Sequence, residues 1–305
     1  MNIRNNVLKL ILLIVILLFL WQIILILIVI IDHMHGIDDR SYDINLLNKS
    51  RSTIPRLIHQ MWKSENLNTY PINNSYFQWK KMYPDYKIRL WTDKDLENLL
   101  LTNDYKYLYS IYKSYIYSIQ RADLGRLIIL HAQGGIYADL DVFPCSEQVE
   151  KLRLSNVSLI IPRSTSGSSV INHFLIAQKS SPILNYILHE IVPLRFYKRI
   201  FLLPYLEVFS TGSFFLTRTL KKYIQLSNEK KEPLWILSDD NVNNYVHHYT
   251  GRSWHFVDGF ILNQFQDKIE IRIIFSFIIF ILFIIIWKYR THFDLCKKFK
   301  GNSTK

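Results

Sequence analysis

Residues 134–142 read GGIYADLDV, and this stretch decides the fold. Alternate side chains of a β-strand point to opposite faces. The apolar side chains at the even positions of 136–142 therefore share one face, and Tyr137, Asp139 and Asp141 share the other. The apolar face is expected to pack on a core. The pattern predicts a strand over 136–142 that carries two carboxylates on one side, near its carboxyl end.

The segments around this strand alternate between helical and extended patterns. A helix is predicted at 118–130, and the glycine pair 134–135 follows it, where glycine favours the backbone that ends a helix. The other predicted elements are strands at 56–62, 86–91, 159–161 and 235–237 and helices at 76–82, 95–101, 183–191 and 214–223. Strands that alternate with helices are typical of a largely parallel sheet covered on both faces, so the expected fold class is α/β.

Asp139 and Asp141 are the first candidates for chemistry. Ligands of open α/β sheets bind at the carboxyl ends of the strands, where this pair is expected. Mg²⁺ and Mn²⁺ take carboxylate oxygens together with the oxygens of a substrate diphosphate. That geometry suits a nucleoside diphosphate sugar, whose departing diphosphate gains negative charge. A solvated surface pair is the alternative, but two like charges that end an apolar strand are costly without a cation or partner.

Asp123 and Arg126 add a second element in the preceding helix. They are three residues apart and therefore lie on one helical face, just before the turn that leads into the strand. An ordinary intrahelical ion pair is one interpretation. Near a phosphate-bearing ligand, the arginine would instead contact phosphate oxygens and the aspartate a sugar hydroxyl. The candidate catalytic set is Asp139, Asp141, Asp123 and Arg126.

Two apolar segments flank the predicted domain. The run 10–31 has Gln22 as its only polar side chain and is long enough to cross a bilayer as a helix. A cleavable signal peptide is the alternative, but its apolar core is shorter and ends in small residues, whereas this run exits into 32–35, read DHMH. The second run, 273–287, is marginal for spanning, and an interfacial helix is its alternative. The basic residues after it favour a span with a cytoplasmic tail.

The charges beside these runs predict a lumenal domain and two cytoplasmic termini. The expected regions are a cytoplasmic N-terminus at 1–9, an anchor at 10–31, a stalk at 32–53, a catalytic domain at 54–265, a second transmembrane helix at 273–287 and a basic tail at 288–305. Acceptor patterns for N-glycosylation lie at Asn48, Asn73 and Asn156. The chain is thus expected in a membrane of the secretory pathway.

The formal net charge of +12 does not indicate a nucleic-acid partner. More than half of the excess lies at Arg4, Lys9 and in the tail from Lys288 onward, where it acts as a topology signal. The two cysteines, Cys145 and Cys296, would lie on opposite sides of the membrane. No disulfide framework is therefore expected within the chain.

Several motifs resemble one known family. The matching stretches are IPRLIHQMWK at 54–63, YPDY at 83–86 with LWTD at 90–93, the run 120–141, PYL at 204–206 with STG at 210–212, and the segment 247–255. With these stretches the chain resembles the DXD-containing glycosyltransferase family 32, which holds yeast-type initiating mannosyltransferases. Within that family it is most similar to the catalytic subunits of mannosyl phosphorylinositol ceramide synthase. The resemblance covers about residues 54 to 260, and its central run is specific.

The resemblance implies a Rossmann-like GT-A fold, Mn²⁺ or Mg²⁺, a nucleotide-sugar donor and transfer with retention at the anomeric carbon. By matched position it implies that Asp139 and Asp141 are metal ligands, with Asp141 the more direct one. Asp123 and Arg126 would hold the donor sugar and its phosphates. GDP-mannose is the donor that the closest branch implies.

The resemblance also implies further binding residues. Trp62 would stack on the nucleotide base, although a core aromatic is its alternative. The remaining substrate-binding residues would be His59, Gln60, Tyr137, Ser253 and Trp254, and His248 would be a further metal ligand, with His247 as the neighbouring choice. One departure is a glycine at position 125, inside the helix between Asp123 and Arg126, which costs about 1 kcal/mol relative to alanine.

The expected activity is metal-dependent transfer of a sugar onto a membrane lipid such as inositol phosphorylceramide, in the Golgi or endoplasmic reticulum. Partners would be the nucleotide-sugar, the lipid and, in this branch, a regulatory membrane subunit. A UDP-linked donor with a glycolipid or glycoprotein acceptor is one alternative. The others are a phosphohydrolase that uses the same carboxylates and an inactive homologue that serves as a membrane subunit.

Overall fold

The computed structural model describes residues 54–70, 74–155, 157–164, 169–192, 211–226 and 233–249, together with eight residues between 6 and 20. The predicted stalk, the second apolar run, the basic tail and the pair Ser253 and Trp254 lie outside the described residues. Within the described part of the chain, no helix is both long and apolar enough to cross a membrane. The predicted anchors thus stay predictions.

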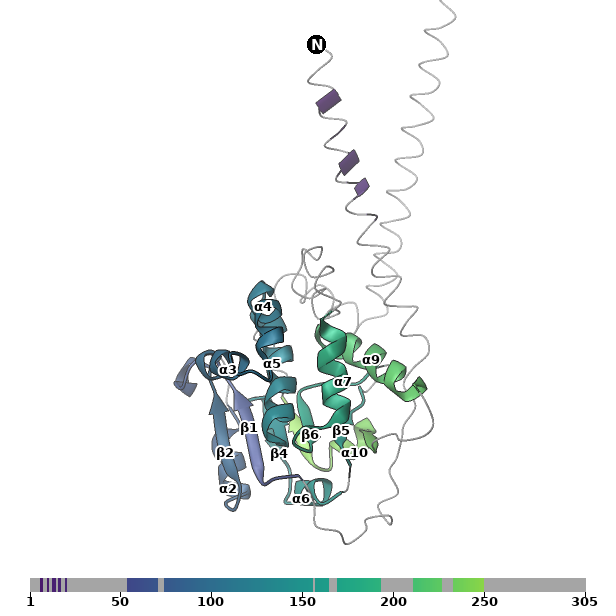
Figure 1. Cartoon of the computed structure of the whole chain (residues 1–305). Coiled ribbons are helices and arrows are strands. Elements are labelled where there is room, and N and C mark those ends of the chain that lie inside the picture. Colours follow the sequence, from purple (N-terminus) through teal and green to yellow (C-terminus); the bar gives the residue numbers. More distant parts are fainter. Residues whose placement is uncertain are drawn as a thin grey trace, which may run out of the picture. The chain divides into compact units, whose positions relative to one another are not determined.

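One six-stranded sheet organises the domain (Figure 1). Its strands are β1 (Leu57–Met61), β2 (Lys87–Trp91), β3 (Gly135–Ala138), β5 (Leu159–Pro162), β6 (Phe174–Ala177) and β7 (Leu234–Leu237), in the order β2-β1-β3-β6-β5-β7. The first three strands pair in parallel, as do β5 and β7. Strand β6 runs antiparallel to both β3 and β5. The sheet is therefore mixed, with less parallel character than predicted.

Helices cover both faces of this sheet. On one face, α3 (Asp93–Leu100), α4 (Lys106–Ser114), α5 (Ser118–Gln133), α7 (Pro182–Ile191) and α9 (Ser213–Gln225) form the larger core. On the other face lie α2 (Tyr76–Met82), α6 (Val149–Arg153), α10 (Asp239–Val242) and a two-stranded sheet of β4 (Val142–Pro144) and β8 (Val246–His248). Neighbouring strand residues divide between the two cores, as Ile136 and Tyr137 do. The α/β fold class is confirmed.

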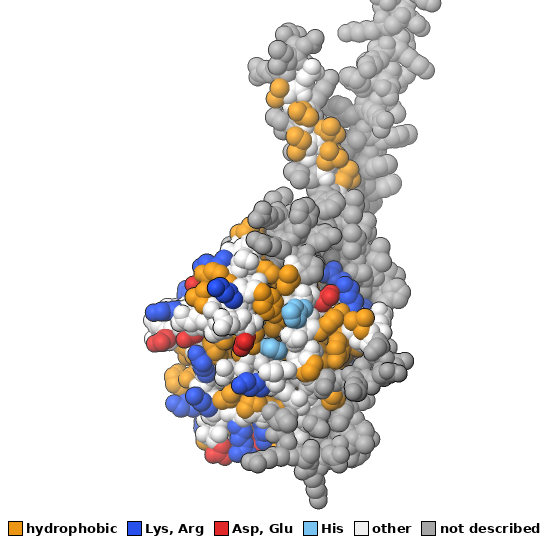
Figure 2. Space-filling view, in the orientation of Figure 1, with side chains coloured by type: hydrophobic (Ala, Val, Ile, Leu, Met, Phe, Trp, Pro, Cys, Tyr) orange, Lys and Arg blue, Asp and Glu red, His pale blue; other side chains and the backbone are white. Residues whose placement is uncertain are grey.

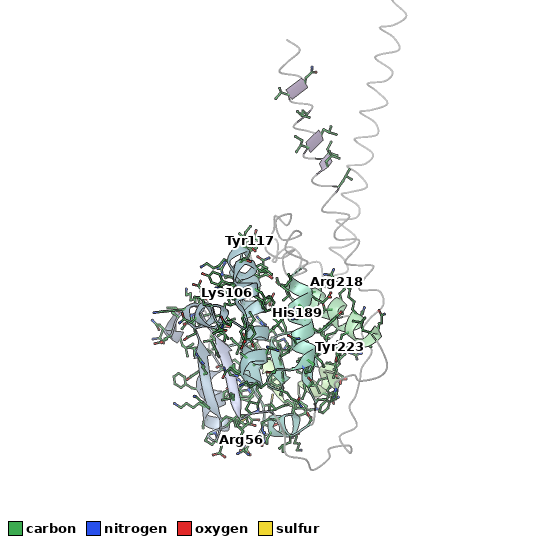
Figure 3. The ribbon with its side chains drawn as sticks, in the orientation of Figure 1. Arg56, Lys106, Tyr117, His189, Arg218 and Tyr223 are labelled. Carbon is green, nitrogen blue, oxygen red and sulfur yellow. The ribbon has the colours of Figure 1, made fainter. Side chains whose placement is uncertain are left out.

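Helix α5 brings its charged residues to the carboxyl end of the parallel strands. Figure 3 places Tyr117, which precedes α5, at the opposite end of the domain from Arg56, which precedes β1. The first half of α5 therefore lies beside the ends of β1 and β3. The helix ends at Gly134, whose φ of 66° is favourable only for glycine, and whose N–H bonds the carbonyl of Leu130.

Close packing explains why a glycine occupies position 125, although glycine lowers the stability of a helix. A Cβ atom built on Gly125 would lie 2.5 Å from Leu96 Cδ2 in α3 and 3.2 Å from the Met61 sulfur in β1. The missing side chain therefore lets α5 approach both elements. Close packing of this helix on the sheet is what holds its charged residues in place.

The predicted strand 136–142 is interrupted. Strand β3 ends at Ala138, and a turn closed by the bond from the Val142 N–H to the Asp139 carbonyl (3.0 Å) redirects the chain into β4. Strand β4 pairs with β8 rather than with the main sheet. The prediction of one continuous strand was wrong because alternation of side chains persists through a tight turn. Asp141 consequently lies in the turn.

Candidate active site

Asp139 directly follows β3, and both of its carboxylate oxygens accept hydrogen bonds. The Tyr137 hydroxyl donates to Oδ1 at 2.9 Å, and Arg126 Nη1 donates to Oδ2 at 3.1 Å. Burial raises the pKa of Asp139 to about 6, although Arg126 lowers it and the charge of Asp141 raises it. The carboxylate keeps 27% of its side-chain surface exposed. It is thus held rigidly at the rim of the buried network.

Asp123 and Arg126 lie behind Asp139 and are almost wholly buried. Their side chains are 3% and 4% exposed and approach to 3.5 Å. Asp123 also accepts hydrogen bonds from Asn172 Nδ2 at 2.8 Å and Thr211 Oγ1 at 2.9 Å. Burial raises the pKa of Asp123, and Arg126 works against that rise. The intrahelical ion pair is therefore present and extends into a network that supports Asp139.

The charge of Arg126 is stabilised by its surroundings. Burial alone would lower the pKa of this guanidinium, but Asp139, Tyr137 and Asp123 hold the pKa above its ordinary value. Nη1 also donates to the Asn172 carbonyl at 2.8 Å, and the guanidinium carbon lies 5.3 Å from the Tyr137 ring centre. Tyr137 itself is buried. A fixed positive charge thus sits directly behind the Asp139 carboxylate.

Asp141, just before β4, lies close to His248, the last residue of β8. The distance from His248 Nε2 to Asp141 Oδ2 is 3.6 Å, and the Tyr249 N–H donates to the Asp141 carbonyl at 2.9 Å. The His248 ring stacks on the ring of His173, with centres 4.1 Å apart and planes at 13°. Burial lowers the pKa of His173 well below its ordinary value. Of the two histidines left open by the sequence, His248 is the one that meets Asp141.

Three polar residues of the site were missed by the sequence interpretation. Asn172 and His173 precede β6, and Thr211 precedes α9. The carbonyl of His173 accepts the Asp139 N–H at 2.8 Å. Thr211 lies in the matched stretch at 210–212, which gave it no role, and Asn172 and His173 lie in a loop with no hydrophobic period, so only the fold shows that the three meet Asp123, Arg126 and Asp139.

His59 and Gln60, predicted to bind substrate, lie inside the core. His59 Nε2 is 2.9 Å from the Gly134 carbonyl, while Nδ1 accepts from Trp91 Nε1 at 3.1 Å. Burial lowers the pKa of His59 to about 4. Gln60 Nε2 donates to Ser75 Oγ at 2.8 Å. Both side chains are at most 1% exposed. The structure therefore corrects their positions: both side chains lie behind the site, where His59 bonds the Gly134 carbonyl and the Gln60 amide nitrogen bonds Ser75.

Trp62 lies in the short loop after β1 and packs against Tyr70. Its Nε1 donates to Thr69 Oγ1 at 2.7 Å, and its ring meets Tyr70 edge-on at 4.8 Å. Burial raises the pKa of Tyr70, and the charges of Asp141 and Asp139 raise it further. Trp62 is only partly buried. The ring is therefore available for contact with a base, and it is fixed by its own hydrogen bond.

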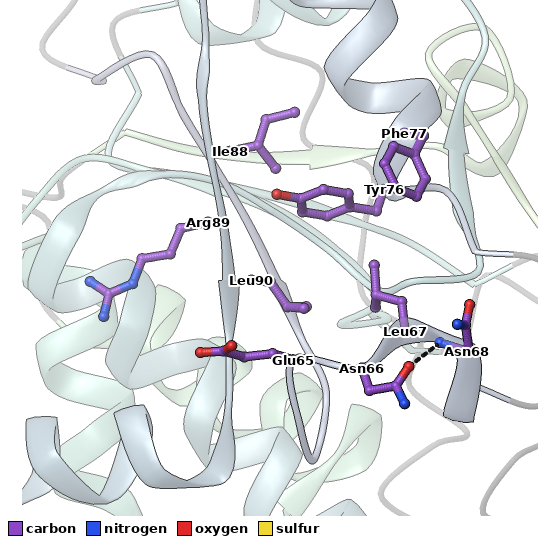
Figure 4. Close-up of a pocket in the computed structure, with 9 residues that line it drawn as sticks. All are labelled: Glu65, Asn66, Leu67, Asn68, Tyr76, Phe77, Ile88, Arg89 and Leu90. Carbon is purple, nitrogen blue, oxygen red and sulfur yellow. Dashed lines mark hydrogen bonds between the residues drawn. The ribbon is translucent and has the colours of Figure 1, made fainter.

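A cavity of about 590 Å³ lies beside residues 65–68 of this loop (Figure 4). It is formed by the short helix η2 (Leu67–Thr69), the edge strand β2 and the start of α2. Its lining residues are Glu65, Asn66, Leu67, Asn68, Tyr76, Phe77, Ile88, Arg89 and Leu90. Figure 4 shows Leu67, Tyr76 and Leu90 turned toward its centre. The candidate carboxylates do not line it, so it is separate from the site around Asp139.

The predicted cation ligands are only partly assembled. Among the residues that the structure describes, no group of three or more His, Cys, Asp and Glu side chains could hold a metal ion. Asp139 has its oxygens bonded to protein donors, whereas Asp141 and His248 form a facing pair of one oxygen and one nitrogen ligand. Mn²⁺ and Mg²⁺ are often held by few protein ligands plus substrate phosphate oxygens and water. The pair therefore fits such a cation.

Basic side chains do not concentrate on the face shown in Figure 2. There, Lys and Arg are dispersed among hydrophobic, acidic and uncharged residues. Electrostatic binding of a polyanion requires a continuous basic stripe or patch. This face offers none within the described residues.

Comparisons with known proteins point to one family. Residues 71–158 match the model of the glycosyltransferase sugar-binding region containing the DXD motif. Inositol phosphoceramide mannosyltransferase 1 of Schizosaccharomyces pombe is 31% identical over 230 residues, which cover 74% of this chain and 70% of the relative. Mannosyl phosphorylinositol ceramide synthase SUR1 of Saccharomyces cerevisiae is 29% identical over 266 residues, which cover 83% of this chain and 65% of the relative.

A solved structure gives a looser likeness. The PaToxG glycosyltransferase is 19% identical, with a TM-score of 0.42 over 56% of this chain and 70% of the other. The family assignment rests on the sequence relatives and the matched DXD region, and it does not use this structure. The chain belongs to the DXD-containing glycosyltransferase family that includes the inositol phosphoceramide mannosyltransferases.

Proposed function

We propose that this glycosyltransferase transfers mannose from GDP-mannose to a membrane lipid of the inositol phosphorylceramide class, with retention of the anomeric configuration. The names of the relatives support the donor sugar and the acceptor. The observation that carries the proposal is the arrangement at the end of β3. There, Asp139 is clamped between Tyr137 and Arg126, and Asp141 faces His248.

In this proposal, Asp141 and His248 hold a Mn²⁺ or Mg²⁺ ion, and Asp139 lies beside them. The bound ion would supply positive charge to the departing diphosphate. Arg126 adds a buried positive charge behind the carboxylates, and Tyr137 and Asn172 fix its direction. Trp62 offers its partly exposed ring to the guanine base. The overall architecture would be a GT-A fold.

The geometry favours a front-face reaction. The acceptor hydroxyl oxygen would bond to the anomeric carbon as the bond from that carbon to the phosphate oxygen breaks on the same face. The departing phosphate would take the hydroxyl proton. A double displacement needs a carboxylate free to form a bond to the sugar. Asp139 is a poor choice for that role because both its oxygens already accept hydrogen bonds.

We also propose that the run 10–31 and the run 273–287 anchor the domain in a Golgi or endoplasmic reticulum membrane, with the domain in the lumen. Their apolar composition and flanking charges support this topology. The test is glycan mapping by mass spectrometry on protein from a eukaryotic host. Glycan at Asn48 agrees with a lumenal stalk, and glycan at Asn302, in the proposed cytoplasmic tail, contradicts the two-span topology.

The activity is tested with purified full-length protein, Mn²⁺, a panel of GDP- and UDP-sugars and a set of lipid acceptors, with products read by mass spectrometry. We expect mannosylated inositol phosphorylceramide from GDP-mannose alone. Asp141→Ala should abolish transfer at saturating Mn²⁺, while Asp104→Ala, at an exposed site, should leave it intact. Transfer from a UDP-sugar would replace the donor assignment, and inactivity with every donor would favour a non-catalytic membrane subunit.

A further inference from the structure

His173 touches the candidate site through both its ring and its backbone. Its ring lies parallel to the ring of His248 at 4.1 Å, with 13° between the planes. Its carbonyl accepts the N–H of Asp139 at 2.8 Å. One residue thus contacts both halves of the site, the turn after β3 and the strand β8.

His248 needs a support of this kind. It lies on the short strand β8, whose main-chain partner is β4. Its side chain is 33% exposed, and Nε2 lies 3.6 Å from Asp141 Oδ2. An exposed imidazole on a short strand has several rotamers open to it. A flat ring packed against one of its faces limits the imidazole to orientations in which its edge points to Asp141.

The support is itself well anchored. Asn172, the preceding residue, donates its amide to Asp123 at 2.8 Å and accepts Arg126 Nη1 on its carbonyl at 2.8 Å. The next residue begins β6, which pairs with β3 from Ala138 back to Gly135. The backbone on both sides of His173 is therefore fixed to the elements that carry the acidic residues.

We propose that His173 is a positioning residue that holds the imidazole of His248 toward Asp141, so that the two side chains form a preformed ligand pair for a divalent cation. This inference rests on the proposed function, which assigns the cation to that pair. His173 acts through the flat face of its ring. A ring without nitrogen should therefore serve nearly as well, which separates positioning from direct ligation.

The test measures Mn²⁺ affinity rather than turnover. Full-length protein in detergent micelles is titrated with Mn²⁺, and free Mn²⁺ is read from its electron paramagnetic resonance signal. Loss of a residue that orients a metal ligand typically weakens affinity about 10- to 100-fold. We expect about that loss in His173→Ala and a change below about threefold in His173→Phe. His173→Ala should add nothing in a His248→Ala background.

A matched control exists elsewhere in the fold. His189 in α7 stacks on Tyr107 with ring centres 5.4 Å apart and planes at 12°, so His189→Ala also removes one ring of a stacked pair. Its Mn²⁺ affinity should equal that of the unaltered protein. Circular dichroism and thermal melting of every variant show that the fold is kept.

The remaining outcomes distinguish the positioning role of His173 from the proposed cation site at Asp141 and His248. Unchanged Mn²⁺ affinity in His173→Ala overturns the positioning role, as does equal weakening by the Phe and Ala variants, which would mean that a ring nitrogen binds the ion. Additive losses in the double variant also overturn it. Unchanged affinity in His248→Ala would instead remove the cation from this pair and thereby contradict the proposed function.

Discussion

Arg126 and Asp139 lie 3.1 Å apart, although one comes from the middle of a helix and the other from the end of the following strand. The contact exists because α5 runs antiparallel to β3 after the turn at Gly134, which brings the first half of the helix beside the end of the strand. Asp123, one helical turn before Arg126, joins the same network. The site is thus built largely from one helix-turn-strand unit.

Arg126→Met tests how much this network contributes to folding. The substitution leaves Asp123, which is 3% exposed, without its cation. Removing one partner of a buried ion pair typically costs about 3–5 kcal/mol, because the other charge stays buried and uncompensated. We expect a loss of unfolding free energy of that size in urea denaturation.

Lys113→Met is the matched control for this loss. The ammonium of Lys113 lies 2.9 Å from Glu97, but the two side chains are 50% and 38% exposed. Exposed pairs contribute little to stability, because water screens the two charges. A loss in Arg126→Met no larger than in Lys113→Met would show that the buried network does not stabilise the fold.

Tyr137→Phe tests the protonation of Asp139. Burial raises the pKa of this carboxyl to about 6, and the hydrogen bond from the Tyr137 hydroxyl opposes the rise by favouring the ionised form. If transfer needs ionised Asp139, activity falls on the acid side of the pKa that this carboxyl has with Mn²⁺ bound. Removal of the hydroxyl raises the pKa further, so the acid limb of the kcat/KM profile should move to higher pH.

The comparison for this profile is Tyr105→Phe. The Tyr105 hydroxyl bonds His131 Nδ1 at 2.7 Å, toward the other end of α5 from Asp123. Tyr105→Phe removes a tyrosine hydroxyl that does not bond Asp139, so the acid limb of the kcat/KM profile should stay at the same pH. An unmoved limb in Tyr137→Phe would mean that Asp139 does not control the activity.

The sequence was most informative where a local pattern coincides with an element. The helix at 76–82 and the strand at 86–91 match α2 and β2 to within one residue, because apolar period and breaking residues act locally. The strand β6 was missed, although its residues 174–177 are all buried. A four-residue apolar run with no alternation has no period to detect, and its antiparallel insertion is set by pairing on both sides.

The residues of the candidate site also divide into those that the sequence predicted and those that it did not. Asp123, Arg126, Tyr137 and Asp139 come from one continuous run, and the structure brings them into one network. His59 was predicted to bind substrate because it is a polar residue close to Trp62 in sequence. Its side chain points inward instead, because the Gly134 carbonyl and the Trp91 ring nitrogen are its hydrogen-bond partners in the core. His173 was missed because its proposed role depends on the ring of His248 in β8, 75 residues further along the chain.

His59→Gln tests the buried position of that histidine through the pH dependence of stability. Burial lowers the pKa of His59 from 6.5 to about 4 in the folded chain. Above pH 6.5 the ring is neutral in both states. Between about 6.5 and 4 only the unfolded state binds this proton, so the contribution of His59 to stability falls as pH falls, by about 1.4 kcal/mol per pH unit. Glutamine can accept from Trp91 and donate to Gly134 without titrating.

The His59→Gln variant should therefore lose less stability between pH 6.5 and 4 than the unaltered chain, as measured by urea denaturation at a series of pH values. His247→Gln, at an exposed histidine, serves as the control for the substitution itself. Equal slopes in all three proteins would show that His59 does not control acid stability.

Gly135→Ala tests the positive φ angle with which β3 begins. Gly135 has a φ of 104°, and a Cβ there would lie 2.6 Å from the Leu57 carbonyl oxygen. The clash is with backbone of the paired strand β1, so it cannot be relieved by a side-chain rotation. Backbone strain and overpacking each cost about 1–3 kcal/mol. We expect a loss of about 2–5 kcal/mol, measured by urea denaturation.

Gly125→Ala provides the contrast. Its nearest contact, at 2.5 Å, is the end of the Leu96 side chain, which can rotate, and its helical backbone accepts alanine. Alanine also favours the helix over glycine by about 1 kcal/mol. Gly125→Ala should therefore cost clearly less than Gly135→Ala. If the order is reversed, the tight approach of α5 to α3, rather than the positive φ of Gly135 at the start of β3, is the stricter constraint on the position of Arg126 and Asp139.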